Sequence, residues 1–318
     1  TEGDTPCVVD VAGIKVGITI CEDIWHKEPA DAARRVGAEL LINLNASPFH
    51  RGKHKERWQV LADRATEQSI PMIYVNQVGG QDELVFDGGS FAVNADGELA
   101  VVAPDFEEGC FDLSVERTVR GIEIAQGVAA TALSDVAAVW QALVLGVHDY
   151  VEKNGFPGVV LGLSGGIDSA VTLAVAVDAL GADRVQAVMM PFKYTADMSV
   201  QDAGEQASIM GVEYDVISIE PIYEAFMAGL TDQFDRLSVD TTEENLQARC
   251  RGVLLMSISN KKNRLVLTTG IKSELAVGYS TLYGDMAGGF DALKDCPTLL
   301  AYALAHYRNT LGYCIPQR

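Results

Sequence analysis

The chain has 318 residues, which is more than a single hydrophobic core usually supports, and we therefore expect two domains. Apolar residues make up 48% and charged residues 21%, a composition typical of globular proteins and not of disordered ones. Lys and Arg total 24 against 44 Asp and Glu, giving a net charge of -20 that repels polyphosphate backbones, so we expect no nucleic acid partner.

The cysteines and the apolar segments indicate the cellular compartment in which we expect the protein. The six cysteines have neither the paired spacing of a zinc site nor that of a disulfide scaffold, and reduced thiols are the simpler interpretation. The longest apolar runs are interrupted well short of a membrane span, and no segment resembles a signal peptide. We expect a soluble, cytoplasmic protein without a membrane partner. Because the first residue is Thr1 and not Met, we also expect a fragment.

The first part of the chain alternates strand-like with helical patterns. The strand-like runs are residues 14–20, 39–44, 71–76 and 89–94, and the helical runs are 29–37 and 53–69. This alternation predicts a layered α/β domain. The turn sequence Asn-Ala-Asp-Gly at 94–97 predicts a hairpin near its end. A stretch without a clear period follows, so we place this domain at residues 1–117 and a linker at 118–132.

The second part opens with a long helical pattern at residues 133–153. The elements predicted after it are a strand at 158–163, a helix at 168–180, a strand at 184–190, a helix at 199–210 and a strand at 213–217. This βαβαβ order predicts a doubly wound parallel sheet in a domain that spans residues 133–318.

A glycine- and serine-rich loop joins the first strand of the second domain to its helix. The loop consists of Gly162, Leu163, Ser164, Gly165, Gly166, Ile167, Asp168 and Ser169. Its glycines let backbone N–H groups approach phosphate oxygens, and its two serines offer hydroxyl donors. It lacks the Lys of a Walker A loop, so charge neutralisation must come largely from elsewhere, for example from Mg²⁺ held by Asp168. A bare pair of glycines would indicate only a turn.

The sequence Ser-Gly-Gly-x-Asp-Ser in this position is more specific than a glycine pair. It resembles the PP-loop of the N-type ATP pyrophosphatases, which split ATP between its α and β phosphates and adenylate a carboxylate or carbonyl oxygen. The resemblance implies an adenine nucleotide α-hydrolase-like fold, with ATP as a co-substrate. NAD synthetase, GMP synthetase, asparagine synthetase and tRNA-thiolating enzymes all carry this loop, so the loop alone does not distinguish among them.

Three further motifs distinguish among these enzymes. They read Glu-Asn-Leu-Gln-Ala-Arg at 244–249, Thr-Thr-Gly-Ile-Lys-Ser-Glu at 268–274 and Gly-Tyr-Ser-Thr-Leu-Tyr-Gly-Asp from 278 onward. They closely resemble NAD synthetase. The resemblance implies that Thr269 contacts ATP and that Asp168 and Glu274 bind Mg²⁺. The residues implied to line the deamido-NAD site are Asn245, Glu274, Tyr279, Ser280, Thr281 and Leu282. From position alone, Glu274 is equally a helix-start carboxylate.

Two positions depart from the family pattern. Ile271 stands where the family usually has Asn, and it has no side-chain hydrogen bond to give. Thr298 stands where the family typically has a Lys thought to contact the ATP phosphates, which removes a positive charge. Either change is expected to reduce activity. The C-terminal Lys contact of the family is also absent, because the sequence ends at Arg318, so we expect this domain to be incomplete at that end.

Cys21 follows the first strand-like run, within the sequence Ile-Cys-Glu-Asp-Ile-Trp. A lone cysteine is more often a small buried hydrophobe than a catalyst. With residues 45–49, 74–80 and 86–90, however, the run resembles the second half of a nitrilase-superfamily amidase, especially the glutaminase domain fused to NAD synthetase. The resemblance implies a partial nitrilase-type α/β sandwich in which Cys21 attacks the glutamine amide and Ser47 and Lys53 contact glutamine. Ser47 is equally a turn residue before Pro48.

Together the two resemblances imply one activity, the ATP-dependent amidation of deamido-NAD to NAD with ammonia from glutamine. They imply small-molecule partners, namely deamido-NAD, ATP and glutamine, and we expect a homo-oligomer. The catalytic Glu and Lys of the nitrilase superfamily normally precede the cysteine, outside this sequence. Two alternatives stay open: another PP-loop amidotransferase, or a nucleotide-binding pseudoenzyme or assembly subunit.

Overall fold

The computed structural model describes residues 3 and 5–317, and its fold divides between Ala142 and Leu143. The two resulting units, Thr1–Ala142 and Leu143–Arg318, are described separately. The division falls inside helix α3 (Asp135–Lys153), so part of this helix belongs to each unit.

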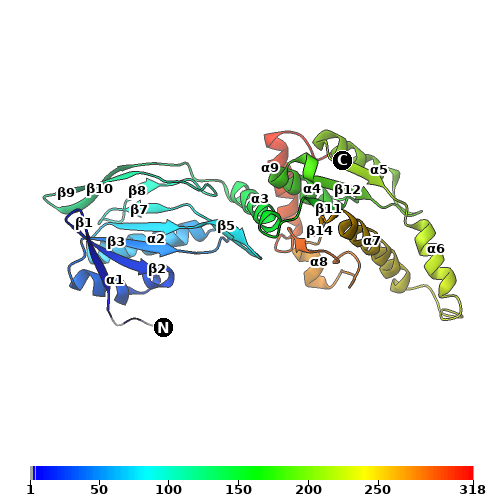
Figure 1. Ribbon diagram of the computed structural model, residues 1–318, viewed down its shortest axis with the longest axis horizontal. Coiled ribbons are helices and arrows are strands. Elements are labelled where there is room, and N and C mark those ends of the chain that lie inside the picture. Colours follow the sequence, from blue (N-terminus) through cyan, green and yellow to red (C-terminus); the bar gives the residue numbers. More distant parts are fainter. Residues whose placement is uncertain (1–2, 4, 318) are drawn as a thin grey trace. The chain divides into compact units, whose positions relative to one another are not determined.

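A mixed sheet with the strand order β1-β2-β3-β4-β7-β8 is the centre of the first unit (Figure 1). Its strands are β1 (Cys7–Val11), β2 (Ile14–Ile20), β3 (Leu40–Asn45), β4 (Met72–Asn76), β7 (Phe91–Val93) and β8 (Leu99–Val102). Strands β2, β3 and β4 are parallel, and the other pairings are antiparallel. The predicted strands and the hairpin at 94–97 are confirmed, whereas β1 was not predicted from the sequence.

Helices α1 (Lys27–Arg35) and α2 (Lys53–Gln68) cover one face of this sheet (Figure 1). Helix α1 buries only small residues, Ala30 and Ala33, toward the core. A Cβ on Gly17 of β2 would lie 3.2 Å from the Cβ of Ala33, so the absence of side-chain bulk lets the helix approach the strand closely. Leu61 and Ala65 of α2 are fully buried in the same core.

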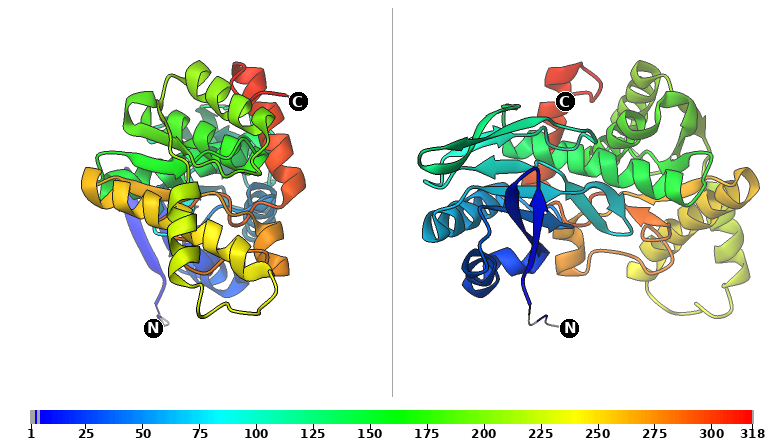
Figure 2. Two further views of the ribbon diagram at one scale, coloured as in Figure 1. Left: turned by 90° about the vertical axis from the view of Figure 1, so that its right-hand side faces the viewer. Right: turned by 60° about the vertical axis from the view of Figure 1, so that its left-hand side comes forward.

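A hairpin of β9 (Leu113–Thr118) and β10 (Gly121–Gly127) packs against the other face (Figures 1 and 2). It occupies most of the segment at 118–132 that the sequence suggested as a linker, and that expectation is corrected here. Ile122 and Ile124 are both at least 95% buried, but two alternating apolar positions are too few to stand out as a strand in the sequence. The shorter ribbon of β5 (Val78–Gln81) and β6 (Leu84–Asp87) was also not predicted.

The sheet of the second unit is entirely parallel and has the strand order β13-β12-β11-β14-β15. Its strands are β11 (Val159–Gly162), β12 (Val185–Met189), β13 (Glu213–Val216), β14 (Leu265–Thr268) and β15 (Phe290–Asp291). Strand β11 is almost completely buried, as expected for a parallel sheet that is covered on both faces. The predicted doubly wound α/β fold is therefore confirmed.

Helices cover both faces of this sheet (Figures 1 and 2). On one face lie α4 (Ile167–Leu180), α5 (Asp197–Met210) and α9 (Thr298–Leu311), and on the other lie α6 (Glu220–Gly229) and α7 (Thr241–Lys262). The short elements are η1 (Cys21–Trp25) in the first unit, and η2 (Ala182–Arg184) and α8 (Lys272–Val277) in the second. Within the described part of the chain, no helix combines the length and the hydrophobicity that crossing a membrane requires.

The order of the strands determines where the second unit can bind a ligand. The chain leaves β11 toward β12 on one side, and β14 pairs with β11 on the other side. The segments that follow β11 and β14 therefore diverge at the same edge of the sheet. Doubly wound folds bind ligands in the crevice that forms at such a point.

Candidate active site

The phosphate-loop candidate leaves the C-terminal end of β11 and enters α4, as the sequence predicts. The hydroxyls of Ser164 and Ser169 lie 3.0 Å apart, and Ser169 also donates to the carbonyl oxygen of Gly166 at 3.0 Å. Ser169 is buried, so its hydroxyl holds the loop in shape, a role that the sequence did not suggest. The first backbone N–H groups of α4 have no acceptors within the helix and remain available to an anion.

Gly165 fixes the position of this loop against the start of α5. Its φ is +81°, and a Cβ at this position would lie 2.2 Å from the carbonyl oxygen of Ser199. A left-handed backbone and a contact this short are both tolerated only by glycine. The loop can therefore pack against α5 only because residue 165 carries no side chain.

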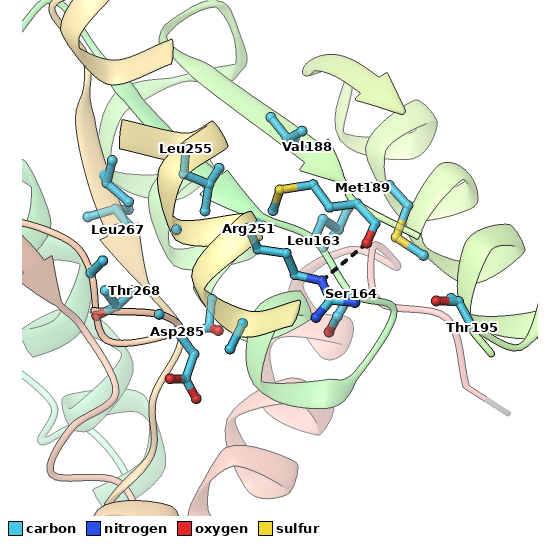
Figure 3. Close-up of a pocket in the computed structure, with 18 residues that line it drawn as sticks. Leu163, Ser164, Val188, Met189, Thr195, Arg251, Leu255, Leu267, Thr268 and Asp285 are labelled. Atoms are coloured by element: carbon cyan, nitrogen blue, oxygen red, sulfur yellow. Dashed lines mark hydrogen bonds between the residues drawn. The ribbon is translucent and has the colours of Figure 1, made fainter. Parts of the chain in front are cut away.

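Two cavities open beside the loop. The first, of about 430 Å³, is the apolar cavity, and Leu163, Val188, Leu255 and Leu267 contribute aliphatic lining to it (Figure 3). The second, of about 200 Å³, is the acidic cavity, and its lining includes the carboxylates of Asp168, Glu274, Asp285 and Asp291. Ser164, Thr269 and Asp285 line both cavities, so the border between them runs from the loop to Thr269. An open cleft thus separates the loop from Thr269.

Two carboxylates of the acidic cavity, those of Asp168 and Asp291, are held in an environment that disfavours their charge. Burial, followed by the negative charge of Glu274, raises the pKa of Asp168. Burial raises the pKa of Asp291 to about 6. Among the described residues, the buried Oδ1 of Asp168 has no hydrogen-bond partner. A bound cation would relieve both effects, since it favours the ionised carboxylates.

The residues of the acidic cavity fit Mg²⁺ only in combination with a ligand. Among residues 3 and 5–317, no three His, Cys, Asp or Glu side chains form a cluster able to hold a metal. Mg²⁺ is, however, commonly bound by one or two carboxylates together with substrate phosphates and water. Asp168 and Glu274 line the same cavity and supply two such carboxylates. Glu274 also accepts a hydrogen bond from the backbone N–H of Ile271 at 3.3 Å, so it stabilises the start of α8 as well.

The residues implied for deamido-NAD are only partly brought together. Glu274, Tyr279 and Ser280 line the acidic cavity. The hydroxyl of Thr281 donates to the side-chain oxygen of Asn245 at 2.8 Å, which connects α7 to the segment after α8. Leu282 is 68% exposed, and it lines neither the apolar nor the acidic cavity.

A third cavity, of about 510 Å³, lies on the side of the loop that faces α5 and α9. Gly165 and Ile167 line this third cavity, and they line neither of the first two. The remaining residues of the loop line the apolar or the acidic cavity. The eight loop residues are therefore divided among three cavities.

In the first unit, Cys21 lies directly after β2, as the sequence predicts, and it begins η1. Its φ of 47° is unusual for a residue other than glycine and indicates local strain of the kind often found at functional sites. The buried side chain of Asn43, on the neighbouring strand β3, donates to the carbonyl oxygen of Cys21 at 3.5 Å and to Thr19 Oγ1 at 3.0 Å. The ends of β2 and β3 are thereby held together at the cysteine.

A buried polar network positions Ser47 at the same edge of the sheet. Arg57 of α2 donates through Nη1 to both carboxylate oxygens of Asp87 at 2.8 Å, and through Nε to the Ser47 hydroxyl at 3.1 Å. Asn76 accepts from the backbone N–H of Ser47 at 2.9 Å and donates to Asp87 at 3.3 Å. Ser47 is therefore fixed by buried partners from α2 and β4, and it is more than a turn residue before Pro48.

Lys53 is the first residue of α2, and its side chain lies over the ring of Trp25. Its Nζ is 4.3 Å from the centre of the Trp25 ring and 3.2 Å from Glu56 Oε2. Trp25 ends the short helix that Cys21 begins, so Lys53 lies next to the element that carries the cysteine. The distance supports a place for Lys53 at this site.

Comparison with known proteins identifies the chain. A family model described as NAD synthase matches residues 139–318. The chain belongs to the NAD synthase family. A second family model, described as carbon-nitrogen hydrolase, matches residues 1–121 ahead of the NAD synthase part. The resemblance of the sequence to glutamine-dependent NAD synthetases is thereby confirmed.

Individual relatives agree with both family models. The chain is 50% identical to the glutamine-dependent NAD(+) synthetase of Acinetobacter baylyi, over 99% of this chain and 58% of that protein. The structure of the glutamine-dependent NAD+ synthetase from Acinetobacter baumannii in complex with ADP has a TM-score of 0.95 at 49% identity, covering 99% of this chain and 60% of that one. An NH3-dependent NAD synthetase from Campylobacter jejuni in complex with the nitrate ion has a TM-score of 0.51 at 34% identity, over 56% of this chain and 75% of its own.

The chain thus spans less than two thirds of the length of the two glutamine-dependent relatives.

The structure shows where Ile271 and Thr298, the two positions singled out in the sequence, lie in the fold. Ile271 is 3% exposed, so it is a core residue. Thr298 begins α9, and its backbone N–H bonds to the Ser273 hydroxyl at 3.1 Å. Thr298 lines neither the apolar nor the acidic cavity of the NAD synthase part.

Sequence reasoning missed three charged side chains that line the apolar and acidic cavities. Asp285 and Asp291 line the acidic cavity, and Arg251 of α7 lines the apolar cavity. Asp285 follows directly on the Tyr-Gly pair of the recognised motif, which was a usable signal. Arg251 follows Arg249 by two residues, and nothing in the sequence distinguishes the side chain that enters a cavity from the one at the surface.

Proposed function

We propose that this chain catalyses the ATP-dependent amidation of deamido-NAD to NAD. The observation that supports it most is the border shared by the apolar and acidic cavities at Ser164 and Thr269. The apolar cavity has the size and aliphatic lining to hold a nucleoside, and the acidic cavity beside it has carboxylates suited to a divalent cation. A nucleotide bound across the border would have its phosphates at the loop.

The proposed reaction has two steps. The nicotinate carboxylate of deamido-NAD attacks the α-phosphate of ATP, pyrophosphate leaves, and an acyl-adenylate forms. Ammonia then attacks the acyl carbon, AMP leaves, and the amide of NAD is formed. The loop residues from Gly162 to Ser169 and Thr269 would orient ATP, so their contribution is mainly positioning and charge stabilisation. Mg²⁺, held by Asp168 and Glu274, would supply charge neutralisation on the phosphates.

For deamido-NAD we propose the segment after α8 together with α7. Tyr279, Ser280 and Thr281 lie beyond Glu274, and the hydrogen bond from Thr281 to Asn245 holds this segment against α7. We include Leu282, whose exposure leaves it accessible to a ligand. Tyr279 and Ser280 of this segment line the acidic cavity, which is where the proposed adenylate must form.

The exchange of labelled pyrophosphate into ATP tests this function, because it requires the first step and no ammonia. We expect exchange that depends on both deamido-NAD and Mg²⁺. GMP synthetase-type activity would instead require a xanthine nucleotide. Nucleotide binding without any exchange would favour the pseudoenzyme alternative and contradict the proposal.

For the first unit we propose a glutaminase role in which Cys21 forms a thioester with glutamine and ammonia leaves. Ser47 and Lys53 would contact the glutamine. Cys7 and Cys110 are exposed, whereas Cys21 is only partly so, and accessibility alone would therefore favour Cys7 and Cys110 for alkylation. We expect an electrophilic glutamine analogue to label Cys21 first, as read by peptide mass mapping. Preferential labelling of Cys7 or Cys110 would contradict the assignment.

We further propose that the protein acts in the cytoplasm as a homo-oligomer with small-molecule partners only. The supply of ATP and the absence of a disulfide within the described part of the chain support a reducing compartment. Light scattering of the purified chain would test the oligomeric state, and a monomer at micromolar concentration would contradict it.

A further inference from the structure

The phosphate site of the second unit lacks an obvious source of positive charge. Its loop carries no Lys or Arg. The acidic cavity beside the loop carries Asp168, Glu274 and Asp291, which would repel a polyphosphate. A divalent cation offsets part of this repulsion, but a triphosphate brings more negative charge than one such ion neutralises. A cation from another element of the chain would offset the rest.

Arg251, on α7, lines the apolar cavity together with Ser164 and Thr195. Its Nε donates to the carbonyl oxygen of Met190 at 3.2 Å. Among the described residues no carboxylate influences its pKa, although Asp285 lines the same cavity. Burial lowers its pKa, and the neighbouring Cys250 opposes this effect only in part. A guanidinium has five N–H donors, and the bond to Met190 uses one of them.

An uncompensated guanidinium in a half-buried cavity is suited to an anion. Figure 3 shows the guanidinium end of Arg251 pointing away from Leu255 and Leu267, toward the side of the cavity where Ser164 and Thr195 lie. Ser164 also lines the acidic cavity, so this side of the apolar cavity is the border that the phosphates of a bound nucleotide would cross. The planar fork of Arg binds phosphate oxygens through two parallel bonds.

We infer that Arg251 binds the phosphate chain of the nucleotide and supplies the positive charge that the loop lacks. This inference rests on the proposed function, because it requires that a nucleotide occupies the apolar cavity. Arg251 then distinguishes nucleotides by phosphate content and not by base. The hydrogen bond to Met190 keeps its side chain in the cavity before the ligand arrives.

Calorimetric titration of the full 318-residue chain with ATP and with adenosine, in the presence of Mg²⁺, tests this role. We expect Arg251→Gln to weaken ATP binding about 10- to 100-fold and adenosine binding less than about twofold, because only the charged hydrogen bonds are lost. Glutamine retains a donor for the Met190 carbonyl. Lys261→Gln is the matched control: it removes one positive charge from the same helix, is exposed and lines none of the three cavities. We expect the control to bind both ligands like the wild type.

Three results would contradict the inference. They are unchanged ATP binding by Arg251→Gln, an equal loss for adenosine and ATP, and a loss of the same size in Lys261→Gln. If the Gln variant does not fold, Arg251→Lys provides the same comparison, with an expected loss of about 3- to 10-fold for ATP alone. A wild-type chain that binds neither ATP nor adenosine would instead contradict the proposed function. The two failures are therefore distinguishable.

Discussion

Replacement of Asp168 by asparagine is expected to lower the rate of ATP–pyrophosphate exchange at least about 100-fold, because the variant would lose the carboxylate that we propose as a ligand to Mg²⁺. The same variant is expected to melt at a higher temperature than the wild type at pH 8. Burial and Glu274 raise the pKa of Asp168, so ionisation of this carboxylate costs stability in the folded state.

The difference in melting temperature between Asp168→Asn and the wild type should depend on pH. Below the ordinary pKa of an aspartate, the carboxyl is protonated in both the folded and the unfolded state, and the substitution should be nearly neutral. As the pH rises above that value, only the unfolded chain ionises freely, and the advantage of asparagine should grow. Thermal melts at pH 3 and pH 8 in magnesium-free buffer measure this difference.

The exposed Asp183, in η2, provides a matched control for Asp168. Asp183→Asn makes the same chemical change, and we expect it to alter neither the exchange rate nor the melting temperature appreciably. Exchange at the wild-type rate in Asp168→Asn would contradict a role in metal binding. A large fall in its melting temperature would show that the carboxylate is instead a structural group.

Replacement of Arg57 by methionine is expected to lower the free energy of unfolding of the first unit by about 3–5 kcal/mol, because it leaves the carboxylate of Asp87 buried without its partner. The side chains of Arg57 and Asp87 are only 1% and 5% exposed. The guanidinium also donates to the hydroxyl and carbonyl oxygens of Ser47, so the Ser47 segment loses its support as well. Urea unfolding followed by circular dichroism measures the change.

Arg117 provides the control for Arg57, because it pairs with a carboxylate at the surface. The ion pair between Arg117 and Glu39 has side chains that are 53% and 29% exposed, and we expect Arg117→Met to cost far less stability than Arg57→Met. In the double variant Arg57→Met with Asp87→Leu, part of the loss should be recovered, since no unpaired charge stays buried. Equal losses in the Arg57 and Arg117 variants would contradict the importance of the buried network.

The sequence predicted best those elements whose pattern is local and long. The strand before the phosphate loop and helix α4 are nearly continuous apolar runs between clear turn residues, and the structure places them as predicted. The hairpin of β9 and β10 was missed because Ile122 and Ile124 are its only fully buried side chains among the described residues. Its stability comes from packing against the sheet, which composition does not reveal.

The site residues were likewise predicted only where their sequence pattern is local. The loop and Thr269 were recognisable because their motifs are continuous in sequence, and Ser164 of the loop and Thr269 each line both cavities. Arg57, Asp87 and Asn76 come from three different elements, and nothing in the sequence indicates that they meet around Ser47. Arg251 was missed for a related reason, because helical position alone does not show which of two nearby arginines enters a cavity.

Because β11 pairs with β14, a bound ligand should stabilise the hydrogen bonding between these two strands. The loop follows β11, Thr269 follows β14, and these strands come from distant parts of the chain yet are direct hydrogen-bonded neighbours. A molecule that touches both segments crosslinks the sheet noncovalently at the place where its winding direction reverses. Local separation of β11 from β14 requires that the bound molecule first dissociates. Saturation with this ligand should therefore slow amide hydrogen exchange in both strands together.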